Sequence, residues 1–149
     1  MYDWFECKVR YEKTIENGLV KKVTEPYLVD AFNFTEAEKR IIEEMKPFIK
    51  GEFEVADIKR VKIADLFESE TESDDRWYKL KLTYTTIDEK KGTEKKTSNY
   101  VIVKAASVKK ALMNLDEGMK GSIMDYVISS VSETPIIDVY HYIQSSDKA

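Results

Sequence analysis

The sequence predicts an α+β protein made of two tandem ββαβ repeats related by a pseudo-two-fold, with mainly antiparallel sheets and one helix each. A strand that runs into a helix occurs twice, as YLVDAFNFTEAEKRIIEEM in residues 27–45 and YVIVKAASVKKALMNLDEGM in residues 100–119. A constant offset of 73 residues separates Trp4 from Trp77, Tyr11 from Tyr84, Tyr27 from Tyr100, and Asp65 from Asp138. Only the helix needs a shift of one residue.

Two explanations account for this likeness. The chain is an internal duplication, or two similar units independently follow the same hydrophobic patterning rules. We favour duplication, because the offset holds at many aromatic and apolar positions. The expected organisation is a first repeat, an acidic linker, a second repeat and a disordered tail, with the two repeats in one compact domain, over residues 1–67, 68–75, 76–143 and 144–149.

The first repeat opens with a strand over residues 4–13, whose side chains alternate in character. One face is apolar and consists of Phe5, Cys7, Val9 and Tyr11; the other consists of Trp4, Glu6, Lys8 and Arg10. Asn17-Gly18 predicts a hairpin turn, because both residue types tolerate positive φ. The second strand is expected over residues 19–31, with Pro26 indicating an irregular or edge position.

The first helix is expected to begin after Thr35, with Glu38 completing a capping box. Its buried face is predicted to hold Ala37, Ile41 and Met45, and its end is marked by Pro47 and Gly51. Residues 53–67 are expected to form one third strand with a bulge near residues 56–58, where the alternation slips.

The second half repeats these signals after ESETESDD, a segment expected to be an exposed linker because it lacks apolar residues. Strands are predicted over residues 77–88, 95–104 and 126–142, the last broken at Pro135. The inward residues of the first of these are expected to be Tyr78, Leu80, Leu82 and Tyr84. Ser107 is expected to cap a helix whose apolar face is Val108, Ala111, Leu112 and Leu115.

A right-handed crossover through each helix would place the third strand of a unit beside its first strand and parallel to its second. Each unit would then be a three-stranded sheet with a helix on one face. Sheets this small are marginally stable alone, so we expect the two units to pack together.

Composition narrows the class of protein. The net charge of −4 argues against bulk electrostatic coating of duplex nucleic acid, although it leaves room for a local basic patch. The single cysteine, Cys7, excludes an internal disulfide and a cysteine-rich metal site. The start MYDWFECK lacks an apolar signal region, and no apolar run is long enough to span a membrane. We expect a cytoplasmic protein without a cofactor.

The segments WFECKVRYEK and YLVDAFNFTEAEKRIIEEM together resemble a family of small uncharacterised proteins from Bacteroidetes and their phages. The resemblance covers most of the first repeat and contains no catalytic motif. It implies a bacterial or phage setting and a domain of unknown function, and it supplies no activity.

Candidate catalytic groups each have a plainer structural interpretation. Asp65 and Asp138 share a repeat position and could hold a cation together, but we expect each to cap a turn or to face water. His141 could act as a general base, but strand packing near the terminus is favoured. Cys7 lies on an apolar strand face, where we expect a buried structural thiol. The pattern therefore predicts no enzyme.

Phosphate-binding signals are weak in this sequence. Glycine-rich phosphate loops are absent, so a bound nucleotide would have to be held by side chains. Lys90, Lys91, Lys95 and Lys96 surround a hairpin turn, where Glu89 and Glu94 dilute their charge. Solvated hairpin tips are the more common role for such residues.

The most informative set of side chains is predicted on the outer faces of the two first strands. It comprises Trp4, Lys8 and Arg10 in one repeat, and Trp77, Lys79 and Lys81 in the other. A tryptophan beside cations can stack a base and neutralise a phosphate. It can equally anchor a protein interface, or it can cover a sheet edge within the monomer.

The sequence favours a non-enzymatic binding or regulatory protein that acts through protein–protein contact and self-association. The alternative is a binder of a nucleotide or single-stranded nucleic acid on the Trp/Lys sheet faces. No membrane partner is expected.

Overall fold

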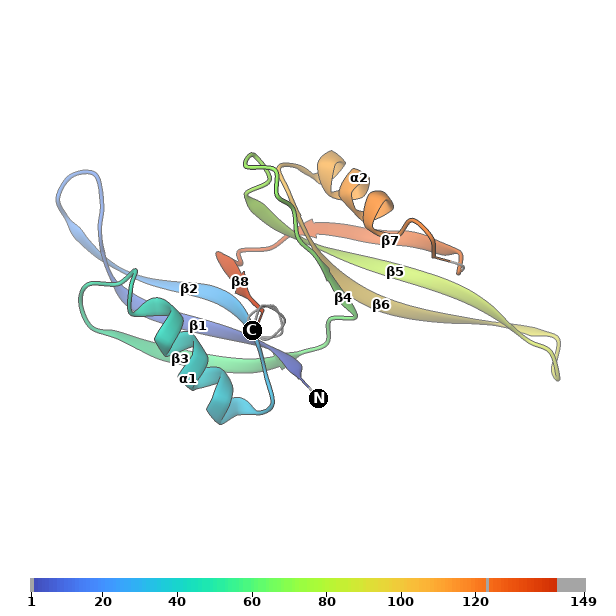
Figure 1. Cartoon of the computed structure of the whole chain (residues 1–149), viewed down its shortest axis with the longest axis horizontal. Helices are drawn as coiled ribbons and strands as arrows, with labels where there is room; N and C mark the ends of the chain where they lie inside the picture. The colour runs from blue at the N-terminus through green and yellow to red at the C-terminus, as the bar shows by residue number, and fades with distance from the viewer. Residues whose placement is uncertain (1, 123, 142–149) are drawn as a thin grey trace. The chain divides into compact units, whose positions relative to one another are not determined.

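A computed structural model describes residues 2–122 and 124–141 of the chain (Figure 1). Eight strands and two helices follow in the described part: β1 Asp3–Thr14, β2 Val20–Ala31, α1 Phe34–Met45, β3 Phe53–Val61, β4 Asp65–Phe67, β5 Arg76–Asp88, β6 Thr93–Ala105, α2 Val108–Gly118, β7 Tyr126–Glu133 and β8 Asp138–Tyr140. The protein is a mixed α+β chain. The tail expected over residues 144–149 lies outside the described residues.

The chain divides into two compact units. Unit 1 consists of residues 1–62 and 135–149, and unit 2 consists of residues 63–134. Each unit holds one sheet of four strands, in the order β3-β1-β2-β8 in unit 1 and β4-β6-β5-β7 in unit 2. The units therefore differ from the predicted repeats, because residues 63–67 belong to unit 2 and the segment after Thr134 belongs to unit 1.

The predicted position of the third strand is correct in both units. β3 pairs with β1 and β7 pairs with β5, both antiparallel, so each lies beside the first strand of its hairpin. The expectation of three-stranded sheets is wrong, because a short parallel strand adds to the free edge of each hairpin. β8 pairs with β2 over Tyr27–Val29, and β4 pairs with β6 over Val101–Val103.

The single strand expected over residues 53–67 is in fact two strands with different partners. β3 ends at Val61, and β4 pairs in the sheet of unit 2. The region expected as residues 126–142 divides in the same way into β7 and β8. Each unit's fourth strand thus comes from the segment that follows the other unit's third strand. Sequence patterning misses this exchange because alternation indicates a strand and does not identify its partner.

The strand registers of the two units match closely. The predicted bulge is confirmed, since Lys8 pairs with Asp57 and Val9 with Val55, which leaves Ala56 as the extra residue. Ser129 is the extra residue opposite Lys81 and Leu82 in unit 2. Ala56 and Ser129 are 73 positions apart.

The offset changes to 74 in the second strand of each hairpin. Trp4 pairs with Asp30, and Trp77 pairs with Lys104. Tyr27 therefore corresponds to Val101, and its expected equivalence with Tyr100 is wrong. One extra residue in the second hairpin explains the difference.

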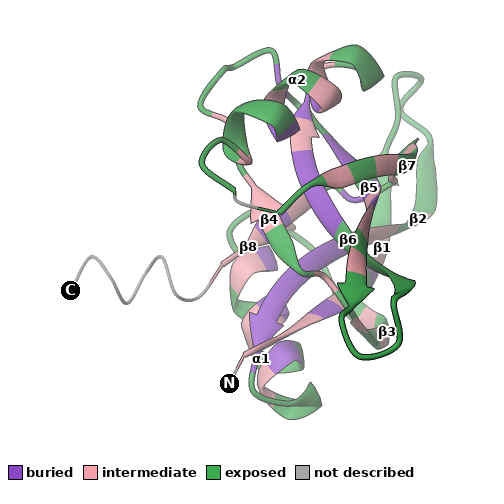
Figure 2. Cartoon of the chain, turned by 90° about the vertical axis from the view of Figure 1, so that its right-hand side faces the viewer, coloured by how far each residue is buried: buried purple, intermediate pink, exposed green. Residues whose placement is uncertain are grey.

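One helix covers one face of each sheet, and the inward residues form the core (Figure 2). The predicted inward residues Phe5, Cys7, Val9, Tyr78, Leu80 and Leu82 are buried. The inward helix residues Ala37, Ile41, Met45, Ala111 and Leu115 are buried as well. Val108 was expected on the buried face of α2, but its side chain is 49% exposed, because it begins the first turn.

The N-cap of α1 is Asn33, and the expectation that Thr35 caps it is wrong. The Asn33 side chain accepts a hydrogen bond from the Glu36 backbone N–H at 2.8 Å. The Glu36 carboxylate in turn accepts one from the Phe32 N–H at 3.1 Å. The capping box thus begins two residues earlier than expected. Ser107 caps α2 as predicted, accepting from the Lys110 N–H at 3.1 Å.

Candidate functional site

The outer face of the unit 2 sheet, opposite α2, carries a group of lysines. Because Tyr78, Leu80 and Leu82 point into the core, the alternate residues of β5 point outward. The strand register adds their cross-strand neighbours in β6. We name as the lysine face the outward residues Lys79, Lys81, Lys96, Tyr100 and Lys104.

Hydroxyl groups, rather than carboxylates, lie opposite these lysines in β7. Ser132 pairs with Lys79, and Ser130 pairs with Lys81. Beside them, the Thr83 hydroxyl lies 3.3 Å from that of Ser98 and 2.6 Å from that of Ser129. Among the strand residues of this face, Glu94, near the hairpin tip, is the one carboxylate. The face is therefore locally basic although the whole chain is acidic.

Tyr100 is the exposed aromatic of the lysine face. Its side chain is 38% exposed, and Lys79 Nζ lies 4.4 Å from its ring centroid. Tyr100 lies directly opposite Lys81 in the register. Sequence reasoning missed this role because it aligned Tyr100 with Tyr27. A one-residue shift in the alignment of the second strands, which aligns Tyr27 with Val101, was the signal that could have found it.

The corresponding face of unit 1 is not basic. Lys8, at the position equivalent to Lys81, lies opposite Asp57 in the strand register. Arg10 forms an ion pair with Glu54, with 2.9 Å between Nη1 and Oε1. The sequence predicted the same binding role for Lys8 and Arg10 as for Lys79 and Lys81. The structure separates them, because only the unit 1 cations have carboxylate neighbours across the strands.

The two tryptophans are not open surface anchors. Trp77 is 2% exposed, and its backbone carbonyl accepts hydrogen bonds from the Thr134 N–H at 2.9 Å and the Thr134 hydroxyl at 2.8 Å. Lys104 Nζ lies 5.5 Å from its ring centroid. Trp4 is half-buried and meets the His141 ring edge-on, with centroids 5.1 Å apart. Alternation placed Trp77 on the outer face, but it did not tell whether that face is covered.

A cluster of charged groups closes the β2–β8 edge of unit 1. Asp30 is 2% exposed, and its Oδ1 accepts from Arg40 at 2.5 Å. Arg40 also donates to the Asp30 backbone carbonyl. His141 Nδ1 lies 2.6 Å from Asp30 Oδ2. His141 is thus part of the packing of β8, as expected, but its contact with a buried carboxylate was not foreseen.

The acidic segment expected as an exposed linker contains a buried carboxylate. Asp74 is 1% exposed and accepts from the Ser69 hydroxyl at 2.5 Å and the Asn114 side-chain amide at 3.1 Å. Burial by itself raises the pKa of Asp74, but the hydrogen bonds from Ser69 and Asn114 outweigh burial, so the net pKa is lowered. The composition of this segment predicted that all of it is solvated, but Asp74 is buried and accepts these local hydrogen bonds.

The structural interpretations of the remaining candidates hold. Asp65 and Asp138 each accept a hydrogen bond from the next residue's backbone N–H, at 2.8 Å in both cases. Cys7 is fully buried, and burial raises the pKa of its thiol to about 12, which keeps it protonated and unreactive. No group of three or more His, Cys, Asp or Glu side chains with metal-binding geometry occurs among the described residues.

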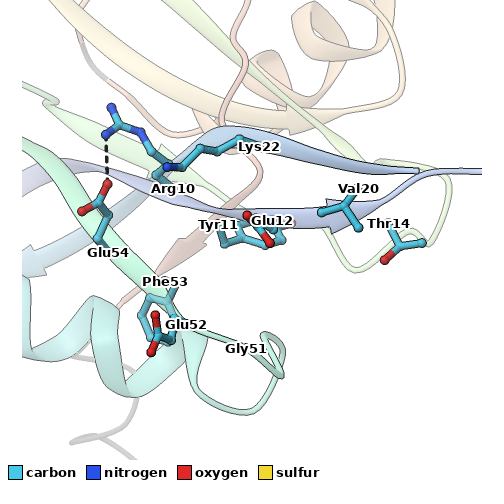
Figure 3. Close-up of a pocket in the computed structure, with 10 residues that line it drawn as sticks. All are labelled: Arg10, Tyr11, Glu12, Thr14, Val20, Lys22, Gly51, Glu52, Phe53 and Glu54. Carbon is cyan, nitrogen blue, oxygen red and sulfur yellow. Dashed lines mark hydrogen bonds and ion pairs between the residues drawn. The ribbon is translucent and has the colours of Figure 1, made fainter. Parts of the chain in front are cut away.

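A groove of about 570 Å³ lies beside the β1–β2 hairpin of unit 1 (Figure 3). Its walls come from the β1–β2 hairpin and from the residues that lead into β3, and include Tyr11, Glu12, Lys22, Glu52 and Phe53. The lining mixes charges of both signs. The groove therefore favours no single class of charged ligand.

Comparison with known families identifies the family of this chain. A family model described as a domain of unknown function, DUF4494, matches residues 3–142. The chain belongs to the DUF4494 family. Membership agrees with the expected resemblance to an uncharacterised family, while the expected origin in Bacteroidetes or phages stays a prediction. A comparison with curated proteins found no match.

The DUF4494 match spans both units and all ten described elements, so the family unit is the whole arrangement rather than one repeat. Neither helix in the described part is long and apolar enough to cross a membrane.

Proposed function

We propose that this chain is a non-enzymatic binding protein whose lysine face takes single-stranded nucleic acid. The observation that carries the proposal is the position of Lys79 and Lys81 beside the exposed ring of Tyr100, with Lys96 and Lys104 further along the same strand face and hydroxyls opposite in β7. Proteins that bind single strands combine a positively charged surface with an aromatic ring on which a base stacks. The lysine face supplies both features.

Net charge favours a single strand over a duplex as the ligand. The net charge of −4 opposes wrapping by a duplex, whose charge density is high. Lys79 and Lys81, two residues apart along β5, could contact the backbone of one strand.

The contact between Lys79 and Tyr100 suggests how binding proceeds. In the free protein the ammonium group lies over the ring as a cation–π pair. A phosphate would draw Lys79 away from the ring, and a base could then stack on Tyr100. Lys79 would thus contact the Tyr100 ring in the free protein and a phosphate in the complex.

Anisotropy of a fluorescein-labelled oligothymidylate, measured over a salt series, tests this proposal. Each lysine that neutralises a phosphate should add about 0.7 to the slope of log K against log salt. Lys81→Ala should lower the slope by that amount and weaken binding. Lys8→Ala, at the matched position in unit 1, should leave both unchanged. Tyr100→Ala should cost about 1–3 kcal/mol with an unchanged slope.

Absence of binding at low salt would refute the proposal, and so would equal losses for the Lys81 and Lys8 variants. A protein partner is the second candidate, favoured by the groove beside the β1–β2 hairpin. It would appear as a complex whose stability is insensitive to the lysine substitutions.

We also propose that the two halves arose by duplication and are related by a pseudo-two-fold. The repeated element order, the bulges at Ala56 and Ser129, and the exchanged strands support this history.

A further inference from the structure

The chain crosses from unit 2 back to unit 1 over a very short segment. The Thr134 N–H donates to the Trp77 carbonyl within unit 2, at 2.9 Å. The Ile137 N–H donates to the Pro26 carbonyl within unit 1, also at 2.9 Å. Pro135 and Ile136 alone lie between these two anchors, and proline restricts the directions in which the chain can turn.

After this crossing segment, β8 binds to unit 1 through both backbone pairing and side-chain contacts. Its backbone pairs in parallel with Tyr27–Val29, and Val139 is 8% exposed. The ring of Tyr140 stacks on Tyr27, with centroids 6.2 Å apart and 24° between the planes. His141 reaches Asp30 at 2.6 Å. Backbone, aromatic and polar side-chain contacts thus define a docking site for this strand.

The same recognition occurs in unit 2. β4 has the sequence Asp-Leu-Phe and β8 has Asp-Val-Tyr, so both present an aspartate, an aliphatic residue and an aromatic residue. The aspartate of each strand accepts from the following N–H at 2.8 Å. Each docks in parallel on the free edge of a hairpin. The free hairpin edge therefore recognises a short strand of defined chemistry, whichever segment supplies it.

We infer that β8 also docks on unit 1 of a second copy of this chain, which produces a strand-exchanged dimer. Every contact of β8 recurs unchanged when the strand comes from another copy, because the docking residues are the same. The balance between closed monomer and dimer then depends on the crossing segment and on protein concentration. A two-residue crossing that contains proline disfavours the closed form, as short hinges do in domain swapping.

The exchange has two consequences for the chain. His141 of one copy would contact Asp30 of the other copy, whose carboxylate also binds Arg40. This group of side chains would therefore form across the dimer. Two lysine faces also become linked, which would raise the avidity for a long single strand without any new contact.

A disulfide trap tests the exchange in the full chain. Leu28 and Val139 are register partners, and adjacent strands lie about 4.7–4.9 Å apart, within the range that a disulfide spans. The variant Leu28→Cys/Val139→Cys, with Cys7→Ala to remove the native thiol, is refolded at low and at high concentration and oxidised. Leu28→Cys/Cys7→Ala alone is the control for random cross-linking.

We expect a covalent monomer after refolding at low concentration and a reducible covalent dimer after refolding at high concentration. A dimer without exchange would keep its disulfide within one chain and migrate as a monomer in denaturing gels, which would overturn the inference. The control should give no dimer at either concentration; an equal dimer band there would also overturn it.

Native mass spectrometry of the unmodified chain provides a second measurement that does not depend on the cysteine variant folding. Refolding at high concentration should yield a dimer that persists after dilution, because release of β8 requires its docking contacts to break. Insertion of four Gly/Ser residues between Pro135 and Ile136 should shift the refolded population towards monomer. A wild-type chain that is monomeric at every refolding concentration would contradict the exchange.

Discussion

His141 Nδ1 lies 2.6 Å from Oδ2 of the buried Asp30, and Arg40 occupies the other oxygen of the same carboxylate. The two contacts tie β8 and α1 to the second strand of unit 1. His141, the last described residue, therefore helps to hold β8 on the sheet that contains β1.

His141→Ala should lower the free energy of unfolding by about 1–3 kcal/mol, because it removes a partner from a buried charged group. Urea denaturation measures the change. The effect of Asp30→Asn should be energetically coupled to that of His141→Ala. The double variant should therefore lose less free energy of unfolding than the sum of the losses in the two single variants. Additive losses would show that the contact between Asp30 and His141 contributes nothing to stability.

The stability contributed by Asp74 should depend on pH. Its folded-state pKa is lowered relative to the ordinary aspartate value of about 3.9. Its contribution is therefore fully present above about pH 4 and is lost as pH falls through the folded-state pKa. Asn114→Ala removes a hydrogen bond to the carboxylate and should move this loss to higher pH. Urea denaturation from pH 2 to 7 tests it, and an unchanged profile would contradict the assignment.

Gly118 should tolerate no side chain, because a Cβ at this position would overlap the Phe67 ring of β4. Gly118→Ala should destabilise unit 2 by about 1–3 kcal/mol through overpacking. Gly51→Ala is the matched control, since a Cβ there meets nothing within 4 Å and its φ is not positive. Equal stability of the two variants in urea would argue that β4 is not packed against α2.

Trp77→Ala should destabilise folding by about 3–5 kcal/mol, the usual cost of truncating a large buried aromatic residue. Trp4→Ala should cost less, because Trp4 is only half-buried. Urea denaturation of the two single variants gives the comparison. A Trp77 variant with wild-type stability would mean that this ring acts at a surface, which is one of the roles that the sequence left open.

Much of the local structure could be predicted from patterns of neighbouring residues. The alternation of Phe5, Cys7 and Val9 predicted a buried strand face, and the slip near Ala56 predicted the bulge. The cap at Ser107 was correct, whereas the one at Thr35 was not, since Asn33 and Glu36 compete for the same helix start. Alternative helix caps of this kind differ by small free energies.

The candidate site was predicted only in part. The sequence singled out Lys79 and Lys81, but it ranked Lys8 and Arg10 equally and chose tryptophan as the aromatic. Tyr100 was missed because its neighbour across the sheet depends on a register shifted by one residue in the hairpin. The charge of a sheet face depends on which strands lie side by side, and this information is not local.

The sequence by itself determined the α+β class, the two helices, the hairpins and the inward faces of the two first strands, because these depend on residue spacing within a short segment. Tertiary structure alone decided that β4 and β8 leave their own repeats. It also decided that Asp30 meets His141 across more than a hundred residues, and that one sheet face is basic while its counterpart carries charges of both signs. The physical reason is that an edge strand offers its backbone to any strand of suitable shape. The chain's path, rather than its local pattern, selects the partner.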